Sequence, residues 1–270
     1  MTRQQLTEQI FSKQTYLCVG LDTDLTKIPA HLQSHPDALF EFNRQIIDAT
    51  KDHCVAYKIN TAFYEALGVK GWEAIQRTVD YIPATHFKIA DAKRGDIGNT
   101  SHQYAKAFFE TMHFDAVTVA PYMGADSVLP FLEYEGKWTI LLGLTSNKGA
   151  QDFELQKVGD AYLYEKVLQT ASRWGTEENL MFVIGATQAD SFTNIRKLTP
   201  AHFYLVPGVG AQGGSLQEIS EKALIGDCGL LVNASRAIIY ASEEEDFATE
   251  AAAIAQQYHW EMKSYLGKMA

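Results

Sequence analysis

Eight short apolar runs, rich in residues that favour strands, recur along the chain of 270 residues. Helix-like segments with apolar residues spaced three and four apart lie between them, for example at 39–49, 71–82 and 162–174. Nearly continuous apolar runs are typical of strands buried on both faces of a parallel sheet. The alternation therefore predicts an α/β fold, a (β/α)8 TIM barrel forming a single domain over residues 1–270. The runs are 16–21, 55–59, 86–90, 116–120, 138–144, 180–184, 203–206 and 229–232.

A doubly wound open sheet is the alternative fold for the same alternation. Such sheets usually carry a G-x-G-x-x-G turn after the first strand, where the backbone approaches a dinucleotide. Here the first run ends in Gly20-Leu21-Asp22, with an acid in that place. The missing turn favours the barrel.

Charge and cysteine content limit the possible partners and location. The net charge of −10 argues against a nucleic-acid partner, which requires a basic surface. No apolar stretch is long enough for a membrane span, and no signal-like run opens the chain. The three cysteines, Cys18, Cys54 and Cys228, lie far apart in or beside apolar segments, which indicates buried free thiols in a reducing compartment. We therefore expect a cytoplasmic protein with neither membrane nor nucleic-acid partners. The acidic run 243–246 is expected in an exposed first helical turn.

The third apolar run continues directly into the pattern Asp91-x-Lys93-x-x-Asp96. Strand alternation puts Asp91 and Lys93 on one face, and Asp96 falls in the turn beyond them. Charges at the end of a buried strand are costly to desolvate unless they compensate one another. The pattern thus favours a functional site, with a surface salt-bridge cluster as the alternative.

Polar residues follow most of the other runs, at the strand ends where barrels of this kind carry their chemistry. The glycine-rich stretch after the seventh run allows backbone N–H groups to converge on an anion, and Arg236 after the eighth adds a bidentate donor. These two loops predict a phosphate site, with Gln212 reaching over it; a flexible turn and a surface arginine are the alternative. The strand-end residues are Asp22, Lys58, Asn60, Asp91, Lys93, 145–147, 207–214 and 233–236.

The stretch 91–100 closely resembles the signature of the orotidine 5′-phosphate decarboxylase family, in the form found in its longer bacterial branch. The same order of motifs covers nearly the whole chain: 19–22, 58–60, 91–100, 145–147, 207–214 and 233–236. The resemblance implies decarboxylation of orotidine 5′-monophosphate to uridine 5′-monophosphate in pyrimidine synthesis. It also implies that no metal, pyridoxal phosphate or thiamine takes part.

Roles for individual residues follow from this resemblance. It implies a charged network of Lys58, Asp91, Lys93 and Asp96, in which Lys93 gives the proton that replaces CO2 at C6. It also implies a homodimer with shared sites, in which Asp96, Ile97 and Thr100 reach the neighbouring site. The implied substrate-binding residues are Asp22, Asn60, Ile97, Thr100, Ser146, Pro207, Gly208, Gln212, Gly213 and Arg236.

Three other functions are compatible with parts of the pattern. A related Mg2+-dependent sugar-phosphate decarboxylase or hexulose-phosphate synthase would carry a glutamate in the second strand, where this chain has Lys58. A Schiff-base aldolase needs a neutral lysine, which flanking carboxylates disfavour. A non-catalytic nucleotide-binding barrel remains possible on sequence, and a turnover assay separates it from an enzyme.

Overall fold

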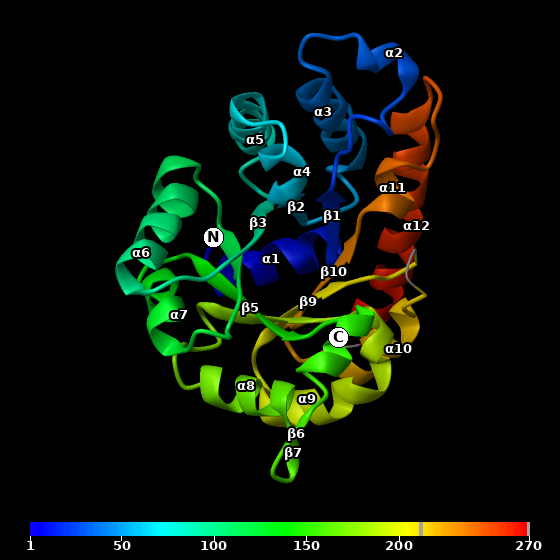
Figure 1. Cartoon of the computed structure of the whole chain (residues 1–270). Helices are drawn as coiled ribbons and strands as arrows, with labels where there is room; N and C mark the ends of the chain where they lie inside the picture. Colours follow the sequence, from blue (N-terminus) through cyan, green and yellow to red (C-terminus); the bar gives the residue numbers. More distant parts are fainter. Residues whose placement is uncertain (211–212, 269–270) are drawn as a thin grey trace.

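Eight parallel strands close into a barrel in this computed structural model, which describes residues 1–210 and 213–268 (Figure 1). The order around the barrel follows the chain, and β1 pairs with β10 to close it. The predicted (β/α)8 barrel is thus confirmed, and the open sheet was the wrong alternative. The strands are β1 Leu17–Leu21, β2 Ala56–Asn60, β3 Phe87–Arg94, β4 Ala116–Val119, β5 Trp138–Leu144, β8 Leu180–Ile184, β9 Phe203–Pro207 and β10 Leu230–Ala234.

Helices surround the barrel, and a short β6–β7 hairpin, Lys157–Val158 and Ala161–Tyr162, projects from it (Figure 1). The long C-terminal helix packs along α3 and β1, so the two ends of the fold meet. The described helices are α1 Arg3–Lys13, α2 Ala30–Gln33, α3 Ala38–Thr50, α4 Thr61–Glu65, α5 Val69–Tyr81, α6 Gly98–Lys106, η1 Ala107–Thr111, α7 Ala125–Leu132, η2 Lys148–Asp152, α8 Leu163–Ala171, η3 Ala186–Ser191, α9 Phe192–Leu198, α10 Leu216–Ala223, α11 Arg236–Ile239 and α12 Phe247–Leu266.

Aromatic side chains close the barrel at the N-terminal ends of its strands. Phe87, Trp138 and Phe203 are each the first residue of a strand, and all three are fully buried. The Trp138 ring packs edge-on against Phe87 and Phe203, at centroid distances of 6.2 and 6.1 Å. Helix α1 lies beneath this layer, and its Arg3 guanidinium stacks on Phe203. Since one end is filled, a ligand can enter the barrel only at the C-terminal ends of the strands.

The third strand was expected to end in Asp91-Ala92-Lys93, and β3 ends one residue later, at Arg94, because it resumes pairing with Val119 of β4 after an irregularity. One predicted boundary was wrong. The acidic run 243–246 precedes α12 instead of forming its first turn. The helix begins at Phe247, which is fully buried and stacks on Phe42, with ring centroids 5.1 Å apart.

Cysteine burial agrees with the sequence analysis. Cys18, Cys54 and Cys228 are all buried and unpaired. Burial in apolar surroundings raises the pKa of the Cys54 thiol to about 12, so this side chain packs as a small apolar group. Over the described residues, each helix is too short or too polar to span a lipid bilayer.

Candidate active site

Lys58 is the centre of the charged cluster at the open end of the barrel. Its side chain, on β2, is only 3% exposed, and its ammonium donates to Asp22 Oδ1 at 2.9 Å and Asp91 Oδ2 at 3.0 Å. Burial alone would lower the pKa of Lys58, but the two carboxylates outweigh it and raise that pKa above the ordinary lysine value. Lys58 therefore stays protonated, and it links the ends of β1 and β3.

Asp91, near the end of β3, accepts hydrogen bonds from both lysines of the cluster. Its Oδ1 accepts from the Lys93 ammonium at 2.5 Å and from the Thr118 hydroxyl at 3.0 Å, while Oδ2 accepts from Lys58. Burial would raise the pKa of Asp91, but Lys58 and then Lys93 hold it well below its ordinary value. Asp91 is thus an ionised, largely buried carboxylate between two ammonium groups.

Lys93 differs from Lys58 in exposure and in backbone conformation. Its side chain is 52% exposed and faces the opening. Its φ is +46°, in the left-handed region that residues with a Cβ adopt at an energetic cost. The predicted contact between Asp91 and Lys93 is present. It forms in an irregular part of the strand and does not follow from simple alternation of side chains. The Lys93 N–H donates to Thr118 Oγ1 at 2.9 Å.

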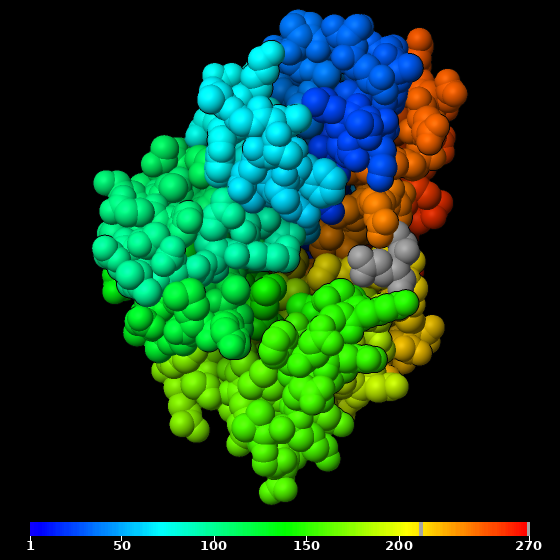
Figure 2. Space-filling model, viewed as in Figure 1, coloured from blue at the N-terminus to red at the C-terminus, as the bar shows by residue number. Residues whose placement is uncertain are grey.

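Two adjoining pockets open onto this cluster, with Lys58, Asp91 and Pro207 lining both. The larger, of about 500 Å³, also contains Lys93 and Ser146 in its wall. Figure 2 shows the surface hollowed between the green loop after β5 and the blue and orange loops after β1 and β10. The smaller pocket, of about 190 Å³, is lined in addition by Asp22, Gly208, Val209, Asn233, Ser235 and Arg236.

Each pocket contains a buried polar atom that has no partner among the described residues. Ser146 Oγ is one, in the wall of the larger pocket, and Asn233 Oδ1 is the other, in the smaller. Buried polar atoms are normally hydrogen-bonded, so unsatisfied ones facing a cavity indicate a ligand with matching polar groups. The two pockets together therefore suit one elongated polar ligand.

The glycine-rich loop after β9 has the backbone expected of an anion site. Gly208, Gly210 and Gly213 have φ of +100°, +75° and +85°, conformations open to glycine at little cost. Gly208 lines the smaller pocket, and Arg236 stands opposite as the first residue of α11. Gln212 lies outside the described residues.

Some predicted residues lie outside both pockets of this chain. Asn60 ends β2 beside Asp91, its register partner on β3. The Asp96 carboxylate accepts from the Ile97 N–H at 2.7 Å, and Thr100 follows in the first turn of α6. Ile97 is 56% exposed. Asp96, Ile97 and Thr100 are therefore not part of the site that this chain forms by itself.

Thr118 is the site residue that sequence reasoning missed. It contacts both Asp91 and the Lys93 backbone from β4, the strand next to them. The sequence shows it only as the single hydroxyl in an otherwise apolar strand. Such a residue can equally be a threonine packed in the core.

Comparison with known proteins assigns the chain to a family. The family model described as "Orotidine 5'-phosphate decarboxylase / HUMPS family" matches residues 15–251. The chain belongs to this family. A relative from Christiangramia forsetii named orotidine 5'-phosphate decarboxylase is 58% identical and is covered fully, as is this chain.

Solved structures agree with the orotidine 5'-phosphate decarboxylase assignment. The structure of Leishmania donovani OMP decarboxylase is 34% identical with a TM-score of 0.80, covering 96% of this chain and 99% of that one. Leishmania donovani UMP synthase is 36% identical with a TM-score of 0.81, over 95% of this chain. The chain spans 56% of that longer protein.

The ionised state of Asp91 predicts how stability depends on pH. Because folding depresses the Asp91 pKa, its contribution is complete above the unfolded value of 3.8 and is lost as pH falls below it. Asp91→Asn should lower the free energy of unfolding by about 2 kcal/mol near neutral pH. The gap to the unsubstituted protein should begin to shrink only as pH falls below about 4, and it should go on shrinking as the pH is lowered further.

Urea unfolding at several pH values measures this gap. Asp160→Asn, in the exposed turn of the β6–β7 hairpin, is the matched control and should change stability little at any pH. A gap for Asp91→Asn that stays constant from neutral to acid pH would contradict the assignment of an ionised Asp91.

Proposed function

We propose that this protein decarboxylates orotidine 5′-monophosphate to uridine 5′-monophosphate and CO2 in pyrimidine biosynthesis. The full-length relatives carry this activity in their names. The observation that carries the proposal is the row Asp22, Lys58, Asp91 and Lys93, whose charges alternate in sign at the open end of the barrel. Such fixed charges act on developing charge without having to reorganise.

In the proposed step, the bond from C6 to the carboxylate breaks, and its electron pair remains on C6. The Lys93 ammonium lies beside this position, stabilises the developing negative charge and transfers its proton to C6. Lys93 then regains a proton from solvent through its exposed side. The Asp91 carboxylate, next to Lys93, repels the substrate carboxylate, and this repulsion is relieved as neutral CO2 leaves.

Lys58 has a positioning role in this proposal. It is buried and donates two of its three N–H groups to Asp22 and Asp91, so it holds both carboxylates in place while Lys93 remains open to the substrate. Asp22 is the partner for a ribose hydroxyl. Asp91 is then held ionised through the reaction because the two ammonium groups keep its pKa low.

The two pockets suit different parts of the nucleotide, the smaller one the phosphate and the larger one the pyrimidine. The glycine-rich loop and Arg236 suit the phosphate, since backbone N–H groups and a guanidinium fork match its oxygens. Ser146, with its unsatisfied hydroxyl, suits the polar edge of the pyrimidine. Pro207 and Gly208 complete the wall. Gly213 lines neither pocket, and it and Gln212 are assigned to the phosphate by family resemblance alone.

A magnesium-dependent reaction is the nearest alternative within the barrel family. It would need a cation between Asp22 and Asp91, but the Lys58 ammonium occupies that position at hydrogen-bond distance from both. The raised pKa of Lys58 also disfavours a Schiff base at this lysine. These observations favour the metal-free reaction, and turnover would exclude a purely nucleotide-binding protein.

The proposal includes a homodimer with shared sites. Asp96, Ile97 and Thr100 follow β3 but line neither pocket of this chain, as expected for residues that serve a neighbour. Exposed apolar side chains continue in the loop after β4, where Tyr122 is 87% and Met123 51% exposed. A second copy covering this surface would bury them. The three free thiols support a cytoplasmic location.

Loss of orotidine 5′-monophosphate absorbance, followed with EDTA-treated protein, tests the reaction. The unsubstituted protein should turn over without metal. Lys93→Ala should reduce kcat by at least about a thousandfold, because both charge stabilisation and the proton donor are lost. Lys106→Ala, on the outer helix α6, is the control and should retain activity. Turnover only after Mg2+ is restored, or undiminished activity of Lys93→Ala, would contradict the proposal.

Mixing two inactive variants tests the shared site. Lys93→Ala and Asp96→Ala homodimers should both be nearly inactive. A heterodimer should recover one intact site, formed by Lys93 of one chain and Asp96 of the other. Co-expression with two different affinity tags gives the heterodimer in pure form for assay. If that verified heterodimer is as inactive as the homodimers, the residues of each site come from one chain.

A further inference from the structure

The segment that carries Asp91 and Lys93 is a bulge in β3. The strand pairs regularly with β4 at Ala90 and Val117, and again at Arg94 and Val119. Three residues of β3, 91–93, therefore lie opposite the single residue Thr118. The ladder with β4 does not fix this segment, and only Asp91 within it pairs with β2, so other contacts must hold the charged side chains in place.

The middle of the bulge is held by Thr118. Its hydroxyl donates to Asp91 and accepts from the Lys93 N–H. This contact fixes the carboxylate of Asp91 and the backbone of Lys93. After Lys93 the main chain returns to the ladder, where the Arg94 carbonyl accepts from the Ala120 N–H at 2.8 Å. The left-handed φ of Lys93 persists only because its surroundings hold it, and side-chain contacts next to it add to the main-chain pairing.

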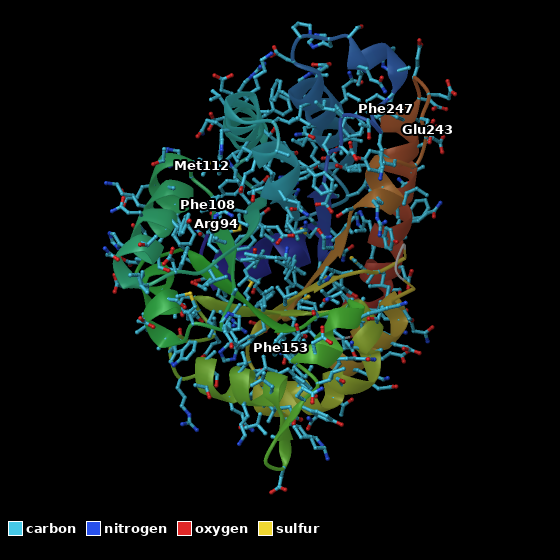
Figure 3. All side chains as sticks on the ribbon, viewed as in Figure 1. Arg94, Phe108, Met112, Phe153, Glu243 and Phe247 are labelled. Carbon is cyan, nitrogen blue, oxygen red and sulfur yellow. The ribbon has the colours of Figure 1, made fainter. Side chains whose placement is uncertain are left out.

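The Arg94 side chain makes these additional contacts. Its Nη1 donates to Ala92 O within the bulge at 3.0 Å, and its Nη2 donates to Glu65 at the end of α4. The guanidinium packs against the rings of Tyr104 and Phe108, at 5.4 and 5.5 Å from their centroids. Figure 3 shows Arg94 and Phe108 next to each other beside β3. Arg94 is thus fixed by three separate elements, α4, α6 and η1.

We propose that the Arg94–Glu65 pair positions Lys93 for the reaction. Arg94 touches no substrate; it acts by holding the bulge, so that the Lys93 ammonium stays against Asp91. Glu65 follows β2, the strand of Lys58, so the pair also ties the elements that carry the two lysines. This inference rests on the proposed function, because it assigns the pair a role in that reaction.

A purely structural role for the pair makes a different prediction. It would lower the amount of folded protein without changing the turnover of each folded site. A positioning role lowers kcat itself, because small displacements of a reacting group are costly in the transition state. KM should change little, since the substrate contacts other residues. The concentration of competent sites is therefore measured separately, by titration with uridine 5′-monophosphate.

The experiment compares Arg94→Met, Glu65→Gln and the double variant with the unsubstituted protein. Methionine keeps an unbranched side chain against the Tyr104 and Phe108 rings but removes the guanidinium group. We expect kcat per competent site to fall about thirtyfold in Arg94→Met, with KM changed less than about threefold. The double variant should fall no further than Arg94→Met, because both substitutions break one interaction.

Arg77→Met is the matched control. Arg77 also pairs with a carboxylate, Asp37, and stacks on an aromatic ring, Phe40, but it lies on the outer helix α5. Its kcat per competent site should equal that of the unsubstituted protein. If Arg94→Met does not fold, Glu65→Gln decides, because it keeps the Arg94 packing and should still lower kcat about fivefold.

The outcomes separate this inference from the proposed function. An inactive unsubstituted protein would contradict both. Normal turnover of that protein, together with unchanged kcat in Arg94→Met or in Glu65→Gln, would overturn the positioning role alone. Additive losses in the double variant would likewise contradict a single Arg94–Glu65 unit.

Discussion

The site depends on one buried ammonium group held between two carboxylates. Lys58 would be costly to bury alone, and so would Asp22 and Asp91. Together they compensate one another at hydrogen-bond distances, with Lys58 only 3% exposed. The arrangement keeps Asp91 ionised and leaves Lys93 as the cation that faces the opening. A fixed pattern of charge is thus in place before any ligand enters.

The barrel makes this arrangement possible by bringing the ends of separate strands together. Asp22 follows β1, Lys58 lies on β2 and Asp91 on β3, and register pairing holds these strands side by side. The aromatic layer around Trp138 fills the opposite end, so the charged groups can face only one opening. The residues that stabilise the fold and the residues that form the site therefore lie at opposite ends of the barrel, as is usual for this architecture.

The sequence predicted those parts of the site that follow from regular structure. Parallel strands in a barrel end on the same side, so apolar runs that end in Asp22, Asp91 or Arg236 were sufficient to place them there. The bulge at 91–93 was not predictable, because it depends on how β3 pairs with β4 and not on alternation within β3. The role of Thr118 follows from that pairing and was missed for the same reason. Asp96 was assigned from family resemblance, and its place in a neighbouring site stays a prediction.

The charge state of Lys58 is the most direct test of this account. The 13Cε resonance of Lys58 can be followed by NMR in protein with labelled lysine, and assigned by its loss in Lys58→Arg. Because Asp22 and Asp91 raise its pKa, Lys58 should keep its ammonium shift as pH rises past the ordinary value of 10.5. Titration of Lys58 at or below that value would contradict the central claim that its charge organises the site.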